Sequence, residues 1–163
     1  MKVSLRVPEN SDFPVLAFLR NDPLVQRQLM VGIAKYSPSQ VRAWIRRRGN
    51  DPQGVFFVID AEGPCGFVQL TRIDMTLGSA DFGICLARSA YGRGIAVQAL
   101  QLLERHAKQK FGCKIITLRV LRINHRAIAF YRKMKFKVTE TKYRFYFDGV
   151  HCRDVVFMEK RLR

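Results

Sequence analysis

The sequence predicts an α/β domain of three layers, with helices on both faces of a mixed, mostly antiparallel sheet of about seven strands. An antiparallel meander is predicted by three apolar segments joined by short turns: 55–59, 65–73 and 80–86. A helical pattern then separates the third segment from another at 114–121, and such a crossover predicts that these two strands are parallel. Asp148-Gly149 lies between two apolar runs, which is typical of a hairpin.

The first thirty residues predict a strand and two helices. Residues 3–7 alternate apolar and polar side chains, as a half-buried strand does. Residues 10–12, Asn-Ser-Asp, are typical of a helix start, and we expect that helix to end before 21–23, Asn-Asp-Pro. A second short helix is expected over 24–30.

A further helix is predicted to begin after Ser37. Pro38 suits the first helical position, and Gln40, three residues after Ser37, completes the pattern of a capping box. Trp44 lies at helical spacing from apolar neighbours, so we expect it in the core.

The second half of the chain predicts two amphipathic helices and a closing hairpin. The first helix begins at about Ile95, with one apolar face made by Ala96, Ala99, Leu100, Leu103 and Ala107. The second helix is expected over 125–134. The hairpin strands are expected over 143–147 and 150–158.

The stretch Gly92-Arg93-Gly94-Ile95-Ala96 connects a strand to a helix. Its glycines allow a sharp turn, and the free N–H groups of the helix start favour a phosphate or pyrophosphate ligand. Arg88 and Arg93 add positive charge. The turn is not a dinucleotide fingerprint, because Val97 holds the position of the third glycine, and it lacks the Gly-Lys-Ser/Thr of a Walker loop.

Two motifs in this half together resemble the GCN5-related N-acetyltransferase superfamily. Residues 91–96, Tyr-Gly-Arg-Gly-Ile-Ala, resemble its acyl-CoA signature, and Asn124, Ala127 and Tyr131 resemble its later Asn-x-x-Ala-x-x-x-Tyr motif. Tyr91 and Lys135 depart from the usual Gln/Arg and Gly. The resemblance implies a three-layer acetyltransferase fold, one domain over 1–163 and an acyl-CoA-binding core over 80–136.

The resemblance also implies acetyl-CoA as cosubstrate and assigns residues to bind it. The pantetheine arm and the acyl carbonyl would be bound by backbone groups of Cys85, Leu86 and Ala87. The pyrophosphate would lie on Gly92, Arg93, Gly94, Ile95 and Ala96. Asn124 would hydrogen-bond the cofactor near its sulfur, and Lys133 would reach one of its phosphates.

Two further residues are candidates for catalysis. Tyr131 matches the superfamily's general acid, and a phenol of pKa about 10 keeps the proton that a departing thiolate needs. Asp81 lies where the superfamily often has an acidic residue and would act as base through water. A surface role for Asp81 remains open, because ordered water alone deprotonates the amine in many relatives.

Residues 19–23, Leu-Arg-Asn-Asp-Pro, together with Met30, resemble a branch that contains acetyltransferases of ribosomal-protein N-termini and of amino-sugar nucleotides. The Arg-Asn-x-Pro and Met30 pattern is most similar to the amino-sugar members, so the resemblance implies a nucleotide-linked amino sugar as the acceptor. Its diphosphate would also suit Arg20, Arg27 and Lys35. A ribosomal or other protein N-terminus is the alternative. A non-catalytic module binding acyl-CoA or nucleic acid is disfavoured, because Tyr131 and the glycine turn are both present.

Composition bounds the remaining expectations. The 163 residues carry 29 Lys and Arg against 13 Asp and Glu, a formal charge of +16 that favours an anionic partner. Nucleic acid is nevertheless disfavoured, because the basic residues are not interleaved with aromatic ones. The four Cys and three His lack metal-ligand spacing, so no metal is expected. Neither a signal peptide nor a membrane span is apparent, so we expect a cytoplasmic protein, and the hairpin is compatible with a homodimer.

Overall fold

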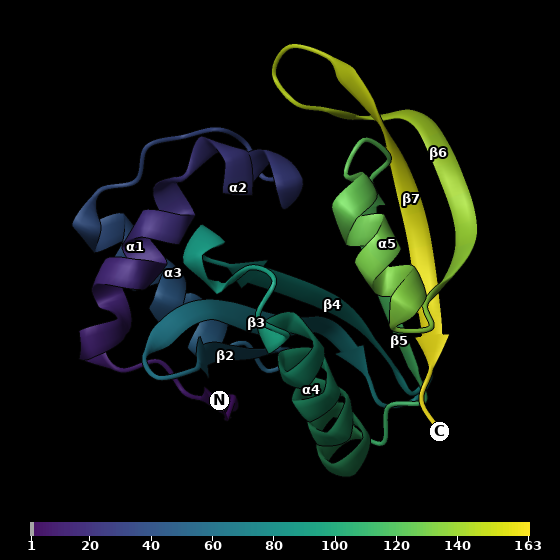
Figure 1. The fold of residues 1–163 in the computed structure, drawn as a ribbon, viewed down its shortest axis with the longest axis horizontal. Helices are drawn as coiled ribbons and strands as arrows, with labels where there is room; N and C mark the ends of the chain where they lie inside the picture. Colours follow the sequence, from purple (N-terminus) through teal and green to yellow (C-terminus); the bar gives the residue numbers. More distant parts are fainter. Residues whose placement is uncertain (1) are drawn as a thin grey trace.

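The computed structural model describes residues 2–163, which form a single mixed sheet flanked by helices (Figure 1). The strands are β1 (Ser4–Arg6), β2 (Val55–Asp60), β3 (Pro64–Asp74), β4 (Ser79–Leu86), β5 (Ile115–Leu121), β6 (Lys137–Phe147) and β7 (Cys152–Arg161). They are ordered β1-β2-β3-β4-β5-β7-β6, and all neighbours are antiparallel except β4 and β5. The predicted mixed, mostly antiparallel sheet of seven strands is confirmed.

The helices begin and end close to the predicted residues. They are η1 (Asn10–Asp12), α1 (Phe13–Asn21), α2 (Pro23–Gln28), α3 (Pro38–Gly49), η2 (Arg88–Ala90), α4 (Ile95–Phe111) and α5 (His125–Lys133). The predicted capping box of α3 forms: the Gln40 N–H donates to Ser37 Oγ at 3.3 Å, and the Ser37 N–H donates to Gln40 Oε1 at 2.8 Å. Trp44 is buried against Phe56 and Phe67, as expected.

Two hydrophobic clusters show that helices cover both faces of the sheet. One cluster joins buried side chains of α4 and α5 to the sheet, and the other joins side chains of α1, α2 and α3 to it. Successive strand residues alternate between them: Phe67 and Cys85 belong to the α1–α3 cluster, while Val68 and Leu86 belong to the α4–α5 cluster. The three-layer prediction is therefore confirmed (Figure 1).

β4 and β5 are parallel, as predicted, but they pair over only a short length. The register joins Ser79–Asp81 to Ile115–Thr117 and then stops. Beyond it, β4 stays paired with β3 as far as Leu86, and β5 stays paired with β7 as far as Leu121. The facing sides of residues 82–86 and 118–121, here called the open edge, thus pair with no described strand. Backbone groups on this edge are available to an extended ligand.

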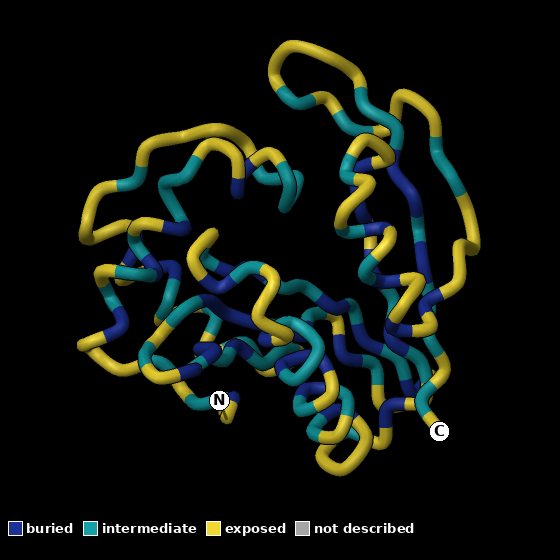
Figure 2. The backbone as a smooth tube through the Cα atoms, viewed as in Figure 1, coloured by how far each residue is buried: buried dark blue, intermediate teal, exposed yellow. Residues whose placement is uncertain are grey.

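The C-terminal hairpin differs from its predicted boundaries. β6 begins at Lys137 rather than at residue 143, and β7 runs over Cys152–Arg161 rather than 150–158. Register shifts interrupt the β6–β7 ladder twice, so the strict alternation that would reveal a long strand is lost. The connection is a loop of residues 148–151, and the Asp148 carboxylate accepts hydrogen bonds from two of its N–H groups. The hairpin projects from the domain, and much of it is exposed (Figure 2).

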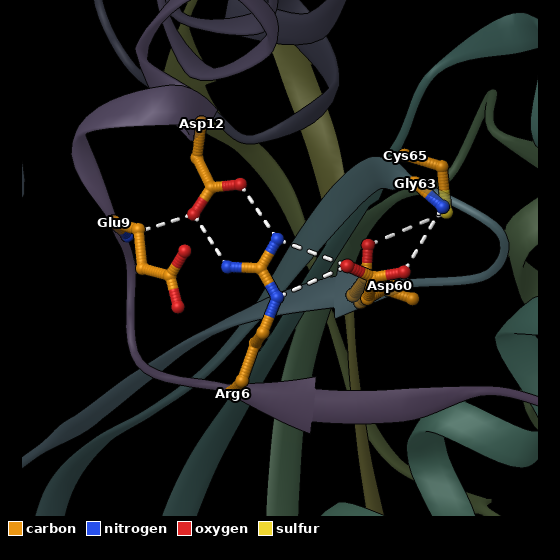
Figure 3. A network of polar contacts seen from close by, with 7 residues as sticks. Arg6, Glu9, Asp12, Asp60, Gly63 and Cys65 are labelled. Atoms are coloured by element: carbon orange, nitrogen blue, oxygen red, sulfur yellow. Dashed lines mark hydrogen bonds and ion pairs between the residues drawn. The ribbon is translucent and has the colours of Figure 1, made fainter.

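A polar network fixes the start of the chain against the sheet (Figure 3). The Arg6 guanidinium donates to both oxygens of Asp12, at 2.7 and 2.8 Å, and to Asp60 at 3.0 Å. Asp12 is completely buried and also accepts the Glu9 N–H at 2.7 Å. These bonds lower the pKa of Asp12, the Arg6 hydrogen bond most of all. Arg6 therefore links β1, the helix start and β2.

Candidate active site

The backbone of β4 presents alternate residues to the open edge. The Ala87 N–H donates to the Cys65 carbonyl at 2.8 Å, so Gly66 and Leu86 form a non-hydrogen-bonded pair of the antiparallel ladder. By the alternation of that ladder, the backbone groups of Ile84 and Leu86 point away from β3 and toward the open edge.

This geometry revises the three residues predicted for the pantetheine arm. Leu86 faces the open edge, but Cys85 forms the hydrogen-bonded pair with Phe67 and so turns its backbone groups toward β3. The Ala87 carbonyl accepts the Ala90 N–H at 2.9 Å, and the Ala87 N–H is used as well. Ile84, which the sequence did not single out, faces the open edge as Leu86 does. Sequence reasoning missed it because only the register shows which residues face the edge.

The glycine turn has the conformation that the sequence predicts. Gly92 and Gly94 have φ of 75° and 74°, the left-handed region that favours glycine. No atom lies within 4 Å of a Cβ built at either position, so open space lies beside the turn. The N–H groups of Ile95 and Ala96, at the start of α4, have no partner within that helix. The turn is thus suited to a phosphate.

Arg93 is part of this turn but is already engaged. It forms an ion pair with Glu62 at 3.7 Å, and both side chains are largely exposed. An exposed pair of this kind is weak, so its disruption by a pyrophosphate would cost little.

We expect Gly94→Ala to lower the free energy of unfolding by about 1–2 kcal/mol. An alanine is strained in the left-handed conformation of this position, although its Cβ would meet no neighbouring atom. Urea unfolding measures this loss. Gly49→Ala is the matched control, because Gly49 also has open space around it and ends α3 with an ordinary φ. An equal loss in both variants would contradict a conformational cause.

Tyr131 lies on α5 and packs on β4. Its ring makes an edge contact with Phe82 at 6.2 Å between centroids, and Phe82 is the first residue of the open edge. Phe136 packs on the same ring at 5.6 Å. Burial raises the pKa of Tyr131, and its hydroxyl makes no hydrogen bond to any other described residue. The phenol therefore stays protonated, and its ring lies beside the start of the open edge.

Asp81 is the last residue of β4 that pairs with β5, and its side chain lies on the opposite face of the strand from that of Phe82. Its carboxylate forms an ion pair with Arg72 and accepts a hydrogen bond from the Thr117 hydroxyl. The structure thus does not bring Asp81 next to Tyr131. Its two oxygens join β3, β4 and β5 where the strands begin to diverge.

Asn124 and Lys133 lie at opposite ends of α5. Asn124 caps the helix, since its Oδ1 accepts the Ala127 N–H at 3.2 Å, and its side-chain amide N–H groups stay available to a ligand. Lys133 is exposed and forms no hydrogen bond, ion pair or ring contact with any described residue. The two residues are nine positions apart, about 13 Å along the helix, so they would contact different parts of a bound cofactor.

Tyr91 and Arg126 form a contact that sequence reasoning did not identify. The Arg126 guanidinium lies 3.8 Å from the centre of the Tyr91 ring. Tyr91 precedes α4 and Arg126 is the second residue of α5, so the contact joins the two sides of the open edge. Tyr91, which replaces the usual Gln or Arg, thus stacks against Arg126, and only the folded chain shows this contact.

The α1–α3 side of the sheet is strongly basic. Residues 13–49 contain one carboxylate, Asp22, against seven basic residues. The Arg20 guanidinium lies 4.3 Å from the Tyr36 ring centre and 5.0 Å from that of Trp44, and its Nε is buried with no hydrogen-bond partner. Burial, and then the charges of Arg48 and Arg47, lower the pKa of Arg20. No described carboxylate neutralises this cation.

Two side-chain amides hold the segment beside Arg20 in place. Gln26 is buried, donates to the carbonyls of Arg20 and Ala34 and accepts the Ala34 N–H. Asn21 exchanges hydrogen bonds with the backbone of Tyr36. The wall formed by α1 and residues 30–36 is therefore fixed by satisfied polar contacts.

Within residues 2–163, no helix is long and apolar enough to cross a membrane, and no three His, Cys, Asp or Glu side chains gather as metal ligands would. Burial raises the pKa of the Cys85 thiol to about 12, so it is protonated at neutral pH. Cys85 is thus poorly suited to act as a nucleophile.

Several solved acetyltransferases share this fold. Spermidine N-acetyltransferase from Vibrio cholerae, solved with CoA and spermine, superposes with a TM-score of 0.89 at 22% identity over 98% of this chain and 95% of its own. RimL, a ribosomal L7/L12 α-N-protein acetyltransferase, gives 0.87 at 19% identity over 99% and 91%. No curated protein sequence matches significantly.

The family itself follows from the sequence match. Residues 2–137 match the family model of the acetyltransferase (GNAT) domain, which is most of the chain. The chain therefore belongs to the GNAT acetyltransferase family, and it is an N-acetyltransferase with acetyl-CoA as its cosubstrate.

Proposed function

We propose that this enzyme acetylates the primary amine of an anionic acceptor, a nucleotide-linked amino sugar. Residues 80–136 form the acyl-CoA-binding core in this proposal. The Gly92–Ala96 turn holds the pyrophosphate, and the free backbone groups of Ile84 and Leu86 bind the pantetheine arm as a neighbouring strand would.

Transfer proceeds by direct attack of the neutral amine on the thioester carbonyl. The C–N bond forms as the C–S bond breaks, and the Tyr131 hydroxyl gives its proton to the departing thiolate. Water takes the proton of the amine. Asp81 supports the site by holding the strands at the point of divergence, since Arg72 and Thr117 already occupy its carboxylate.

The assignment of an anionic acceptor rests on the basic residues of segment 13–49, here called the basic wall, and above all on Arg20. Arg20 and Phe67 line a recess of only about 10 Å³, room for no more than a water-sized group such as one ligand oxygen. Phe67 pairs with Cys85, one residue from Leu86. The buried Nε of Arg20 lacks an acceptor, and a phosphate oxygen would supply one. A polycationic acceptor would instead be repelled, because residues 13–49 carry seven basic side chains and a single carboxylate.

A protein N-terminus is the second candidate acceptor. The similarity to RimL over 99% of this chain favours it, and an acidic N-terminal segment would also suit the basic wall. The two candidates differ in the group that Arg20 would bind: a diphosphate in one case and side-chain carboxylates in the other.

An acceptor panel tests the assignment. Acetyl-CoA is incubated with UDP-linked amino sugars, ribosomal-protein N-terminal peptides or spermidine, and mass spectrometry identifies the acetylated product. We expect turnover of the UDP-linked sugars. Turnover of peptides alone would select the second candidate, and efficient turnover of spermidine would contradict an anionic acceptor.

Arg20→Gln should raise the KM of the anionic acceptor by about ten- to a hundredfold, because a charge-assisted hydrogen bond is lost. The KM for acetyl-CoA should stay constant. Arg42→Gln is the matched control: Arg42 is an exposed arginine of α3 that stacks on Phe13. An unchanged acceptor KM in Arg20→Gln would remove Arg20 from the acceptor site.

A further inference from the structure

A concave basic surface lies between the C-terminal half of α4 and the strands β6 and β7. It encloses about 1590 Å³ and is lined by Gln101, Glu104, Arg105, Lys108, Gln109, Lys135, Lys137, Glu159, Lys160, Arg161, Leu162 and Arg163. Seven of these residues are basic, two are acidic and none is aromatic. We call this surface the basic groove.

Internal pairing neutralises only a small part of this charge. Lys160 forms an ion pair with Glu104 at 2.6 Å, and the Lys108 ammonium donates to the Arg163 carbonyl at 2.8 Å. The other basic side chains of the groove form no ion pair or hydrogen bond with any described residue: Arg105, Lys135, Lys137, Arg161 and Arg163. Of the two groove glutamates, Glu159 alone remains to face them. Such a surface attracts an anion that carries several charges.

Lys135 is held in the groove at a conformational cost. It follows α5 with φ of 72°, where glycine would be relaxed and a lysine is strained. Its side chain is exposed and forms no hydrogen bond, ion pair or ring contact with any described residue, so no such interaction explains it. The turn itself needs no lysine, since its bond to Arg132 uses the backbone N–H alone. What a lysine adds at this position, compared with a glycine, is the positive charge of its side chain.

The α4 part of the groove lies away from the glycine turn. Its lining on α4 begins at Gln101 and ends at Gln109, about 9 to 21 Å along the helix from Ile95, where the glycine turn ends. The pyrophosphate turn at the helix start therefore leaves the groove free for another partner.

We propose that the basic groove binds the phosphodiester backbone of duplex nucleic acid. The α4 lining is about 12 Å long, and a duplex carries about seven phosphate charges over that distance. A lining without aromatic side chains contacts backbone rather than stacking on unpaired bases. The sequence disfavours nucleic acid because no aromatic residues are interleaved; the groove uses phosphate contacts, to which that criterion does not apply.

Fluorescence anisotropy with a fluorescein-labelled 16-base-pair RNA duplex tests this binding at several salt concentrations. In a triple variant, Arg105, Lys135 and Lys137 are each changed to Gln. We expect affinity to fall at least tenfold and the slope of log K against log salt to decrease by about 3. The matched control changes three exposed cations outside the groove to Gln: Lys2, Arg46 and Arg144. It should retain most of the affinity.

Two further measurements separate this site from the active site and from a structural role. The triple variant should keep the wild-type KM for acetyl-CoA. Lys135→Gly should weaken duplex binding without lowering the melting temperature. Equal losses in both triple variants, tighter binding of the single strand than of the duplex, or binding of polyglutamate in place of the duplex would each overturn the proposal.

Discussion

Tyr131→Phe should lower kcat on the order of a hundredfold or more and leave the KM for acetyl-CoA nearly unchanged. The change removes only the hydroxyl that we propose as the proton donor to the thiolate, and a loss of this size is typical of a general acid. The ring contacts with Phe82 and Phe136 are retained, so the melting temperature should change little. Steady-state kinetics by mass spectrometry of released CoA measures the effect without interference from the four Cys of the chain.

Tyr143→Phe is the control for this result, because Tyr143 is an exposed tyrosine of β6. Its activity should equal that of the wild type. If Tyr131→Phe retained full kcat, the proton would have to come from water, and Tyr131 would be a packing residue only. Because burial raises the pKa of Tyr131, the wild-type activity should not fall through deprotonation of this phenol up to pH 10.

Arg6→Met should destabilise the protein by about 3–5 kcal/mol at neutral pH, because it leaves the Asp12 carboxylate buried without its cation. Methionine fills similar space, so the loss comes mainly from the charge. Urea unfolding measures it. Arg122→Met is the matched control: its ion pair with Asp154 is 3.2 Å long and exposed, and its loss should cost less than about 1 kcal/mol.

The pH dependence distinguishes an electrostatic cause from lost packing. In the wild type the folded pKa of Asp12 is lowered, so its stabilising contribution is present above about pH 3.9 and is lost as the pH falls through the lowered value. In Arg6→Met, burial should instead raise the folded pKa, so stability should decrease as the pH rises through that value. The variant should therefore regain part of its loss at pH 4. An equal loss at pH 4 and pH 7 would indicate packing.

Local sequence patterns were sufficient for most of the fold. The capping box at Ser37 and the glycines at 92 and 94 act through contacts within a few residues, so their signatures predict their structures. The β6–β7 hairpin was predicted less well, because bulges break the alternation from which strands are recognised. The family match over residues 2–137 agrees with the motifs that suggested an acetyltransferase.

Some residues of the candidate site could likewise be predicted from the sequence, and others could not. Sequence motifs selected Tyr131, Asn124 and the Gly92–Ala96 turn, because each needs a particular residue type at a fixed spacing. Register decided that Ile84 and Leu86 face the open edge, and tertiary contacts occupied Asp81 with Arg72 and Thr117. These features depend on which strands are neighbours.

The sequence by itself determined the α/β class, the position of the glycine turn and the choice of Tyr131 as the candidate acid, since short-range backbone and side-chain chemistry sets each of them. Only the tertiary structure decided where β4 leaves β5, which arginine Nε atoms are buried without an acceptor, and how distant lysines and arginines gather into one groove. The reason is physical: such features arise when residues far apart in the chain share a strand edge, a buried volume or an electric field, and no local pattern records that proximity.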